Sequence, residues 1–245
     1  MLKEEGEKML RNNALEEISD GKLYGREDMV KVNCGGCVNC SSCCHNMGDT
    51  VVLDPFDFAR MSVGLRKRPQ ELIAEGVMLG VIDGLVLPHL RVQGLDNACY
   101  YLDGNGRCSI HSYRPGICRL FPLGRYYHEE TFSYILQVNE CKNQGRSKMK
   151  VKQWIDTPNL KAYEEYILRW HHLMKRTGNY LANAEERRQE ICTAMLEIFY
   201  FRSYEGERNA MDGSASAQKP VAFDASAFYD AFDARVQEFI KTRLI

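Results

Sequence analysis

The segment that decides the fold reads Cys34-Gly-Gly-Cys37-Val-Asn-Cys40-Ser-Ser-Cys43-Cys44. Two-residue gaps between cysteines allow a tight turn to direct two sulfurs at one ion. Thiolates packed this closely repel one another unless a cation neutralises them. Cysteines three residues apart in a turn rarely reach the geometry of a disulfide. Because glycine, asparagine and serine fill the gaps, the segment has little apolar surface to bury, and we expect bound metal to order it.

The cysteine spacing favours iron over zinc as the bound metal. Cys34, Cys37, Cys40 and Cys44 follow C-x2-C-x2-C-x3-C, the spacing found in bacterial [4Fe–4S] ferredoxins. His45 stands where those proteins usually have proline, and its position beside Cys44 makes it a candidate ligand. The chain has no second such run, so it does not repeat the ferredoxin fold. Zinc in a tetrahedral thiolate shell is the alternative.

More candidate ligands follow the segment. The chain has ten cysteines, and nine of them lie between positions 34 and 141. The four outside the segment are Cys99, Cys108, Cys118 and Cys141. Nine cysteines are one more than two four-thiolate sites need, so the total allows two clusters, one cluster with one zinc, or two zincs. Cys192 lies beside Ile191 on a predicted helix face, and we interpret it as a core residue.

Composition narrows the class of protein. The 245 residues are 44% hydrophobic and 27% charged, which is typical of a globular chain. A net charge of −1 provides no overall basic field, so we expect no nucleic-acid partner. The N-terminal residues are charged throughout, unlike a signal peptide, and no run reaches the roughly 18 apolar residues of a membrane span. We therefore expect a cytoplasmic protein without a membrane partner, in which so many cysteines indicate metal.

Residue periodicity predicts an α+β fold, with a small, irregular, cysteine-rich metal-binding core of short strands and hairpins followed by a C-terminal helical region. Helices are expected at 2–20, 54–64, 69–76, 160–174, 183–202 and 224–245. Strands are expected at 51–53, 85–93 and 132–138, with a hairpin turn at 103–106. The predicted divisions are an N-terminal helix at 1–30, a cysteine-cluster metal-binding domain at 31–150, a helical extension at 151–205, a flexible linker at 206–223 and an amphipathic helix at 224–245.

The cysteine pattern resembles the CxxCxxCC cysteine-cluster family of zinc- or iron-chelating proteins, often called YkgJ-like. The resemblance spans about residues 34–145 and rests on Cys37-x2-Cys40-x2-Cys43-Cys44, Cys99-Tyr-Tyr-Leu-Asp, Cys108-Ser-Ile-His, Arg114-Pro115-x2-Cys118-Arg119-Leu-Phe-Pro122 and Cys141. It implies eight metal ligands, namely Cys37, Cys40, Cys43, Cys44, Cys99, Cys108, Cys118 and Cys141. On that mapping Cys34 is the spare cysteine, whereas the ferredoxin spacing leaves out Cys43.

Three functions are consistent with these residues. The first is a protein carrying one or two [4Fe–4S] clusters that transfers electrons or senses redox state, with an unidentified protein or redox partner. Arg114 and Arg119 flank Cys118 and are candidates for binding an anionic cluster. The second is a cluster-dependent enzyme using S-adenosylmethionine, because flagellin lysine N-methylases resemble this family. No glycine-rich nucleotide loop supports it independently, and no catalytic residue is identified. The third is a zinc-stabilised binding module.

Overall fold

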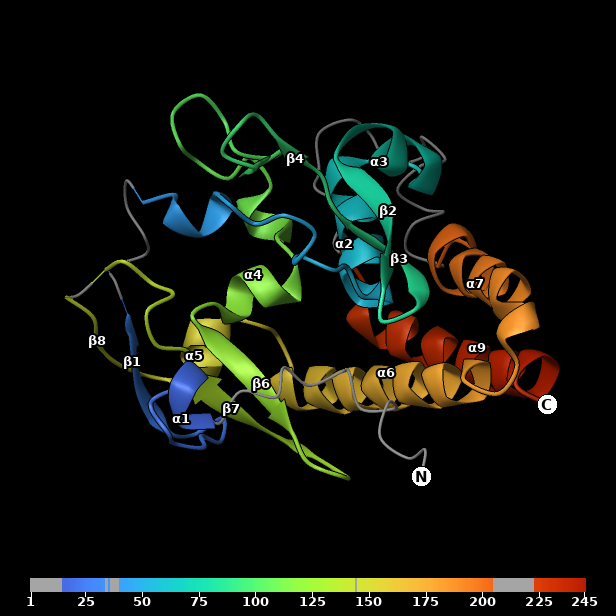
Figure 1. Cartoon of the computed structure of the whole chain (residues 1–245). Helices are drawn as coiled ribbons and strands as arrows, with labels where there is room; N and C mark the ends of the chain where they lie inside the picture. The colour runs from blue at the N-terminus through green and yellow to red at the C-terminus, as the bar shows by residue number, and fades with distance from the viewer. Residues whose placement is uncertain (1–14, 34, 36–39, 144, 205–222) are drawn as a thin grey trace, which may run out of the picture. The chain divides into compact units, whose positions relative to one another are not determined.

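The computed structural model describes residues 15–33, 35, 40–143, 145–204 and 223–245 (Figure 1). They form a mixed α+β fold of helices and short antiparallel strand pairs, as the sequence predicts. The chain divides into two compact units that interleave along the sequence. We call residues 1–48, 93–109 and 116–170 the cysteine unit, and residues 49–92, 110–115 and 171–245 the helical unit. No helix in the described ranges is long and apolar enough to cross a bilayer.

The cysteine unit is built from short elements. In chain order they are α1 (Leu15–Ile18), β1 (Met29–Asn33), the 3-10 helix η1 (Ser42–Cys44), β5 (Ala98–Cys99), α4 (Gly116–Leu120), β6 (Leu123–Tyr127), β7 (Phe132–Leu136), β8 (Ser147–Lys150) and α5 (Val151–Ile155). β1 pairs antiparallel with β8, and β6 pairs antiparallel with β7. β4 (Val92–Gln93), at the boundary between the units, pairs with β5.

The core of the cysteine unit gathers around β1 and α5. Val30 and Val32 are buried, while Met29 and Lys31 are exposed, which is the two-residue alternation of a half-buried strand. The indole nitrogen of Trp154 on α5 donates hydrogen bonds to the backbone oxygens of Leu120 and Phe121, at 3.2 and 3.1 Å. These bonds fasten α5 to the end of α4, which is the helix that carries Cys118.

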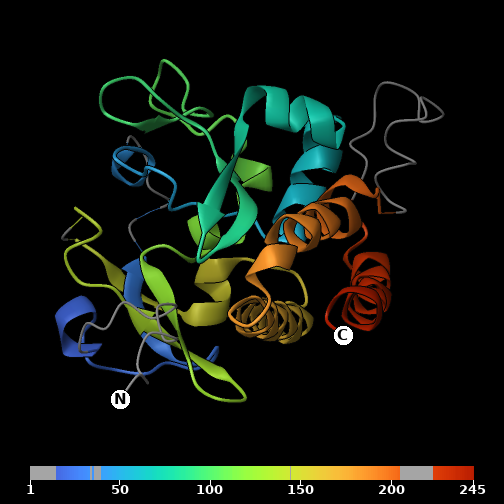
Figure 2. The same ribbon diagram turned by 45° about the vertical axis from the view of Figure 1, so that its right-hand side comes forward.

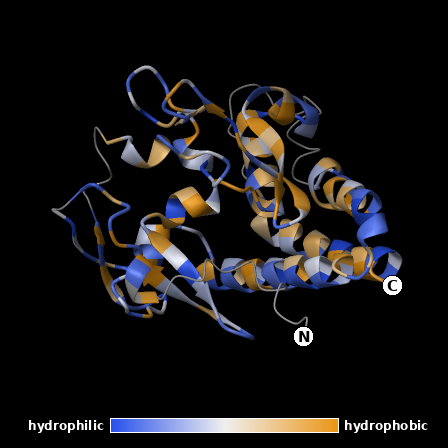
Figure 3. Ribbon diagram, viewed as in Figure 1, coloured by the Kyte–Doolittle hydropathy of each residue, from blue (hydrophilic) through white to orange (hydrophobic). Residues whose placement is uncertain are grey.

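The helical unit contains most of the longer helices. Its elements are α2 (Pro55–Leu65), α3 (Pro69–Glu75), β2 (Val77–Ile82), β3 (Leu85–Leu90), the 3-10 helices η2 (His111–Tyr113) and η3 (Glu185–Arg187), α7 (Arg188–Leu196), the π-helix η4 (Glu197–Phe201) and α9 (Ala225–Arg243). α6 (Leu160–Leu181) belongs to the cysteine unit up to Trp170 and to the helical unit from His171. β2 and β3 form an antiparallel hairpin that is mostly hydrophobic (Figure 3).

Local sequence sets where α2 begins, and aromatic packing holds it in place. The Asp54 carboxylate accepts a hydrogen bond from the Asp57 backbone amide at 2.9 Å, and Pro55 occupies the first helical position. Phe58 is buried and packs edge-on against Tyr200, with ring centroids 5.5 Å apart. The Tyr200 hydroxyl donates to the Leu53 backbone oxygen at 3.0 Å, so η4 is fastened to the start of α2.

α7 packs against β3 and α9, and both views show α7 beside α9 (Figure 1, Figure 2). A buried arginine on α9 closes the π-helix. Arg235 donates hydrogen bonds to the backbone oxygens of Ile198, Arg202 and Ser203 at 2.7–2.9 Å. Its guanidinium lies 3.6 Å from the ring centroid of Tyr204. The carbonyls at this helix end therefore have a charged donor in place of water.

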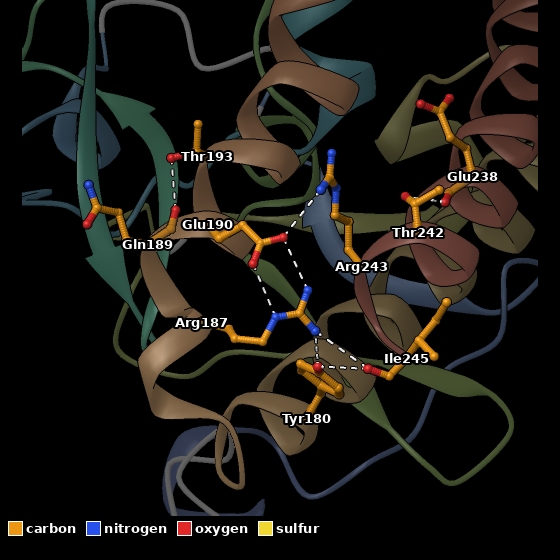
Figure 4. Close-up of polar contacts among 9 residues, drawn as sticks. All are labelled: Tyr180, Arg187, Gln189, Glu190, Thr193, Glu238, Thr242, Arg243 and Ile245. Atoms are coloured by element: carbon orange, nitrogen blue, oxygen red, sulfur yellow. Dashed lines mark hydrogen bonds and ion pairs between the residues drawn. The ribbon is translucent and has the colours of Figure 1, made fainter.

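The ends of α6, α7 and α9 are joined by a polar network within the helical unit (Figure 4). Arg187 makes a two-point contact with the Glu190 carboxylate, with both N–O distances at 3.1 Å. Arg243 of α9 approaches the same carboxylate at 3.3 Å. Arg187 also donates to the Tyr180 hydroxyl, which donates to the Ile245 backbone oxygen at 3.0 Å. These contacts tie the ends of the three helices to one another.

Most predicted helices are confirmed, and the differences lie in the strands. The helices expected at 54–64, 69–76, 160–174 and 224–245 are present, while the one expected at 183–202 is divided into η3, α7 and η4. Strands β1, β2, β6 and β8 were not predicted. At 51–53 only Val52 bridges to β3. Residues 1–14 of the N-terminal helix expected at 1–30, and residues 206–222 of the expected linker, lie outside the described residues. The expected N-terminal helix is wrong beyond Ile18, where α1 ends: Ser19 and Tyr24 form strand-like bridges, and β1 begins at Met29. The domain boundaries stay a prediction.

Candidate metal centre

The cysteine segment ends in a short 3-10 turn. η1 begins after Ser41, and the Cys44 backbone amide donates to the Ser41 oxygen at 2.8 Å. This turn presents Cys43 as an exposed side chain and Cys44 as a half-buried one. Cys40 is exposed, with its sulfur 3.7 Å from the Ser42 hydroxyl. Cys34 and Cys37 lie outside the described residues.

Two further cysteines flank the predicted hairpin turn. Cys99 on β5 is buried, at 5% exposed, and Cys108 forms a bridge with Leu102 on the returning strand. The Asp103 carboxylate accepts hydrogen bonds from the backbone amides of Asn105 and Arg107 at 2.9 and 2.8 Å, which closes the turn between them. The hairpin is therefore confirmed, and it sets Cys99 and Cys108 on the two arms of one turn.

Cys43, Cys44, Cys99 and Cys108 lie within electrostatic reach of one another. The pKa of Cys44 is raised far above its usual range, chiefly by a side-chain hydrogen bond with Cys43, then by burial, and then by the charges of Cys43, Cys99 and Cys108. Burial is the main cause of the raised pKa of Cys99, and Cys108 and Cys43 contribute to it. A hydrogen bond from the Tyr101 backbone amide to Cys99 lowers the pKa of this thiol and so offsets part of the increase. We call these four residues the cysteine quartet.

The chemistry of the quartet fits zinc or iron. Thiolate is the preferred ligand for zinc and for iron–sulfur clusters, and four thiolates complete a shell for either. In the described part of the chain, no three Cys, His, Asp or Glu side chains are close enough together to hold a metal ion. The four thiols of the quartet therefore influence one another electrostatically, but their sulfurs are not arranged around a common metal position.

Hydrogen bonds join the two chain segments that carry the quartet. The backbone amides of Asn46 and Met47 donate to the backbone oxygens of Asp96 and Asn97, at 2.8 and 3.4 Å. Alongside them, Nδ1 of His45 lies 2.6 Å from Oδ2 of Asp96. The hydrogen bond from His45 lowers the pKa of the Asp96 carboxyl. Sequence reasoning identified His45 but missed Asp96, whose only local signal is an acidic side chain three residues before Cys99.

The other described cysteines lie on other elements. Cys118 lies on α4 and Cys141 follows β7, both half-buried and both in the cysteine unit. Cys192 is buried on α7 in the helical unit, in agreement with its interpretation as a core residue. Thus every predicted cysteine ligand that is described belongs to the cysteine unit.

The two candidate cofactor-binding arginines have different surroundings. Arg119 is buried on α4, at 3% exposed, and its guanidinium lies 5.5 Å from the ring centroid of Tyr163. Arg114 belongs to the helical unit, where its Nη1 donates to Nε2 of His111 at 2.9 Å. Assignment of either residue to a cluster stays a prediction.

The cysteine unit also contains a half-open pocket of about 230 Å³. Aromatic side chains of Tyr24, Phe132 and Tyr134 contribute to its lining, together with Glu164 of α6. The Tyr134 hydroxyl donates to Oε1 of Glu164 at 2.8 Å, and Arg26 pairs with Oε2 at 3.2 Å. The pocket thus combines flat apolar walls with a fixed carboxylate.

A comparison with known protein families finds a match for the cysteine-rich segment. Residues 36–151, just under half of the chain, match the model of the CxxCxxCC family, described as a putative zinc- or iron-chelating domain. No curated protein and no solved structure matches the chain significantly. The match covers the quartet, Cys118 and Cys141, and it supports metal binding by this segment. Residues 36–151 are therefore similar to the CxxCxxCC family, described as a putative zinc- or iron-chelating domain.

Proposed function

We propose that the cysteine unit binds a [4Fe–4S] cluster through the quartet and exchanges electrons with a redox partner protein. The observation that carries the proposal is the grouping of Cys43 and Cys44 in η1 with Cys99 on β5 and Cys108 on the hairpin, whose interactions also raise the pKa of Cys44 and of Cys99. Thiols that interact in this way destabilise one another as thiolates. A bound cation would remove that repulsion and stabilise the arrangement.

The donor set suits an iron–sulfur cluster as well as zinc. The quartet offers sulfur alone, and four thiolates are common ligands of both. Burial of Cys99 shields part of the site from water, and the Tyr101 amide supplies a hydrogen bond to its sulfur. Such hydrogen bonds and such shielding tune the potential of a bound cluster. The bound cluster would supply one-electron chemistry, and these residues would hold it and set its potential.

The quartet supports the eight-cysteine ligand set over the ferredoxin set. Cys43 forms a side-chain hydrogen bond with Cys44, and its charge contributes to the raised pKa of Cys99. Cys43 therefore lies near both residues. The ferredoxin spacing leaves out Cys43, whereas the family pattern includes it and leaves out Cys34. We therefore infer that Cys34 is the spare cysteine. A second centre would draw on Cys37, Cys40, Cys118 and Cys141, and the metal content per chain measures whether it exists.

Anaerobic purification tests the proposal directly. We expect a brown protein with iron and acid-labile sulfide in equal amounts and broad visible absorption. Cys43→Ser and Cys99→Ser should lose most of that absorption. Cys34→Ser should keep it, and so should Cys192→Ala, the control in the helical unit. A colourless protein with bound zinc would replace the redox role with the zinc-stabilised module, since zinc is d10 and has no redox chemistry. A protein free of both metals would overturn metal binding itself.

A second candidate is the cluster-dependent modifying enzyme, and the pocket in the cysteine unit is the observation that favours it. Phe132 and Tyr24 offer ring faces on which a purine can stack, and the Glu164 carboxylate suits a hydroxyl or a sulfonium cation. Calorimetric titration of the metal-loaded chain with S-adenosylmethionine tests it. Binding that weakens about tenfold in Phe132→Ala would support the enzyme. Absence of S-adenosylmethionine binding to the wild-type protein would contradict the enzyme candidate.

A further inference from the structure

The ladder formed by β1 and β8 lies in a strongly basic part of the chain. Residues 142–152 contain five basic side chains and no acidic one, although the whole chain has 32 basic and 33 acidic residues. Both strands belong to the cysteine unit, where Figure 1 shows β1 beside β8. The ladder is therefore a local concentration of positive charge in a chain with almost no net charge.

Strand alternation directs the charged side chains of the ladder to solvent. The two valines of β1 are buried, so Met29 and Lys31 point to the other side, where they are exposed. The register places Met29 opposite Lys150 and Lys31 opposite Lys148. Because opposite residues of an antiparallel pair share a face, all four side chains lie on the solvent side of the ladder. We call Met29, Lys31, Lys148 and Lys150 the basic face.

Two lysines of the basic face repel each other. Lys31 and Lys148 are direct cross-strand neighbours, and like charges at such positions destabilise a ladder. In the described part of the chain neither of them makes an ion pair, whereas Glu27 pairs with Lys150 at 3.4 Å and with Lys152 at 2.8 Å. Any polar side chain would satisfy these two exposed positions. Carboxylates brought by a bound partner would relieve the repulsion.

We propose that the basic face docks the redox partner, and that the partner presents an acidic protein surface to it. The proposal rests on the proposed function for the redox role of the partner. Complementary charges steer two proteins together and raise the rate at which they associate. Complexes that transfer electrons are commonly small and transient. Lysines gathered around the half-exposed side chain of Met29 suit an encounter of that kind.

The chain connects the basic face to the cysteines. Cys34 directly follows β1 in the sequence, and Cys141 lies six residues before the start of β8. At this end of the ladder the Asn33 side-chain amide donates to the Ser147 hydroxyl at 3.1 Å. A partner held on the ladder is therefore held beside the strand ends that lead to two candidate ligands.

Nucleic acids and anionic membranes are also attracted to basic surfaces, but the side chains of the basic face favour a protein. Single-stranded nucleic acids are bound largely by stacking of bases on aromatic rings, and the face has none. Segments that bind at a membrane surface combine their lysines with several large apolar side chains, whereas Met29 is the single apolar member of the face. Lysines at fixed cross-strand spacing suit carboxylates that a folded protein holds in place.

Surface plasmon resonance with the full metal-loaded chain tests the proposal. The probe is a one-electron carrier with an acidic surface, a [2Fe–2S] ferredoxin. Its association should slow by at least about tenfold when the ionic strength rises from about 0.01 M to about 0.15 M, because the Debye length falls from about 30 to about 8 Å. The double variant Lys31→Glu/Lys148→Glu should associate at least about tenfold more slowly at low salt and lose most of this salt dependence.

Two controls separate docking from net charge and from folding. Lys175→Glu/Lys241→Glu makes the same change of charge at exposed lysines of the helical unit, and it should associate like the wild type. Lys148→Glu alone sets a carboxylate opposite Lys31, so its thermal unfolding midpoint should rise while its association slows. Slower association together with a lower unfolding midpoint would mean that the lysine acts through the fold, and it would overturn the proposal.

The remaining outcomes distinguish this proposal from the proposed function. Ferredoxin association that ignores salt, or that is unchanged in Lys31→Glu/Lys148→Glu, would overturn the docking surface and leave metal binding intact. Tighter binding to phosphatidylserine vesicles or to a DNA duplex than to ferredoxin, lost in the same double variant, would also overturn it. A zinc-loaded chain that still associates through these lysines would keep the acidic docking partner and remove the redox role.

Discussion

The two units of the molecule are stabilised in different ways. Residues 40–48 and 96–109, which carry most of the candidate ligands, bury only the side chains of Met47, Cys99 and Tyr101. The helical unit buries phenylalanines from α2, η4 and α9, many of which contact one another edge-on or stacked. Apolar burial therefore explains the helical unit but contributes little to the cysteine loops. The loops depend on backbone geometry and, by our proposal, on metal.

Backbone geometry in the loops is specified at particular positions. Asn46 and Asn97 adopt positive φ on the two segments that hydrogen-bond to each other, and Gly106 does so in the hairpin turn. Asparagine and glycine adopt this conformation most readily. The loops therefore have a defined path without a core, but each turn contributes only a small stabilisation.

Removal of the metal should produce the largest effect of all, and it should destabilise the cysteine loops but not the helical unit. Structural metal sites can supply about 10 kcal/mol or more of folding free energy. After a chelator strips the metal, amide hydrogens of residues 40–48 and 96–109 should exchange much faster. Amides of α2, α7 and α9 should keep their protection, because aromatic packing holds them. Hydrogen exchange followed by mass spectrometry measures both regions in one experiment.

A matched control is the wild-type chain treated with the metal-saturated chelator, which should show no change in exchange. Equal loss of protection in α9 would contradict the comparison, because it would mean that the helical unit depends on the same centre. Unchanged exchange in both regions would mean that turn geometry alone orders the cysteine loops.

Shortening a buried side chain in the helical unit should have the opposite pattern of effects: it should lower stability and leave metal binding unchanged. Phe232 of α9 is fully buried and contacts Phe199 and Phe228, with ring centroids 5.7 and 6.0 Å away. Phe232→Ala should reduce the free energy of unfolding of the helical unit by about 3–5 kcal/mol, because it leaves a cavity. Metal content per chain should not change. Denaturant unfolding followed by circular dichroism, with metal analysis of the same sample, measures both quantities.

The helices were predictable because their signals are local. Asp54 and Pro55 mark the start of α2, Pro69 marks α3, and apolar residues at three- and four-residue spacing mark α6 and α9. β1 and β8 carry no comparable signal. Met29 pairs with Lys150, more than a hundred residues away, and each strand is only four or five residues long. Long-range pairing of such short strands does not leave a local pattern.

The candidate site was predictable in its ligands but not in their grouping. The cysteines stand out by their spacing and residue type. The grouping of the quartet depends instead on backbone hydrogen bonds between distant parts of the sequence, from Asn46 to Asp96 and from Met47 to Asn97. Asp96 had no motif of its own, since an acidic residue in a polar loop is ordinary. The contact between Asp96 and His45 can be recognised only in the folded structure.

A smaller effect is expected from the arginine that closes the π-helix. Arg235→Met keeps the apolar stem but leaves the carbonyls of Ile198, Arg202 and Ser203 without their charged donor. We expect a loss of about 2–3 kcal/mol in the unfolding free energy of the helical unit, the range for unsatisfied buried polar groups. Arg202→Met is the control, because its exposed pair with Glu238 should contribute less than about 1 kcal/mol. Equal losses in the two variants would contradict this account of Arg235.

The smallest effect concerns acid stability of the helical unit. Burial, followed by the charges of His172 and Lys175, lowers the pKa of His171 on α6 from 6.5 to about 4. Because the folded pKa is the lower one, the unfolded chain binds the extra proton first, and stability falls as pH drops from about 6.5 toward 4. His171 is half-buried, so solvent screening limits this loss to about 1 kcal/mol.

His171→Gln isolates that contribution. The variant cannot take up the proton, so its unfolding free energy should decline less than that of the wild type between pH 6.5 and 4. His128→Gln, at an exposed position on the β6–β7 hairpin, should follow the wild-type curve. Parallel curves for the wild type and His171→Gln would show that solvent reaches the imidazole freely. Because the helical unit depends on packing that excludes water, the pH dependence of stability that His171 causes measures how completely water is excluded from this part of α6.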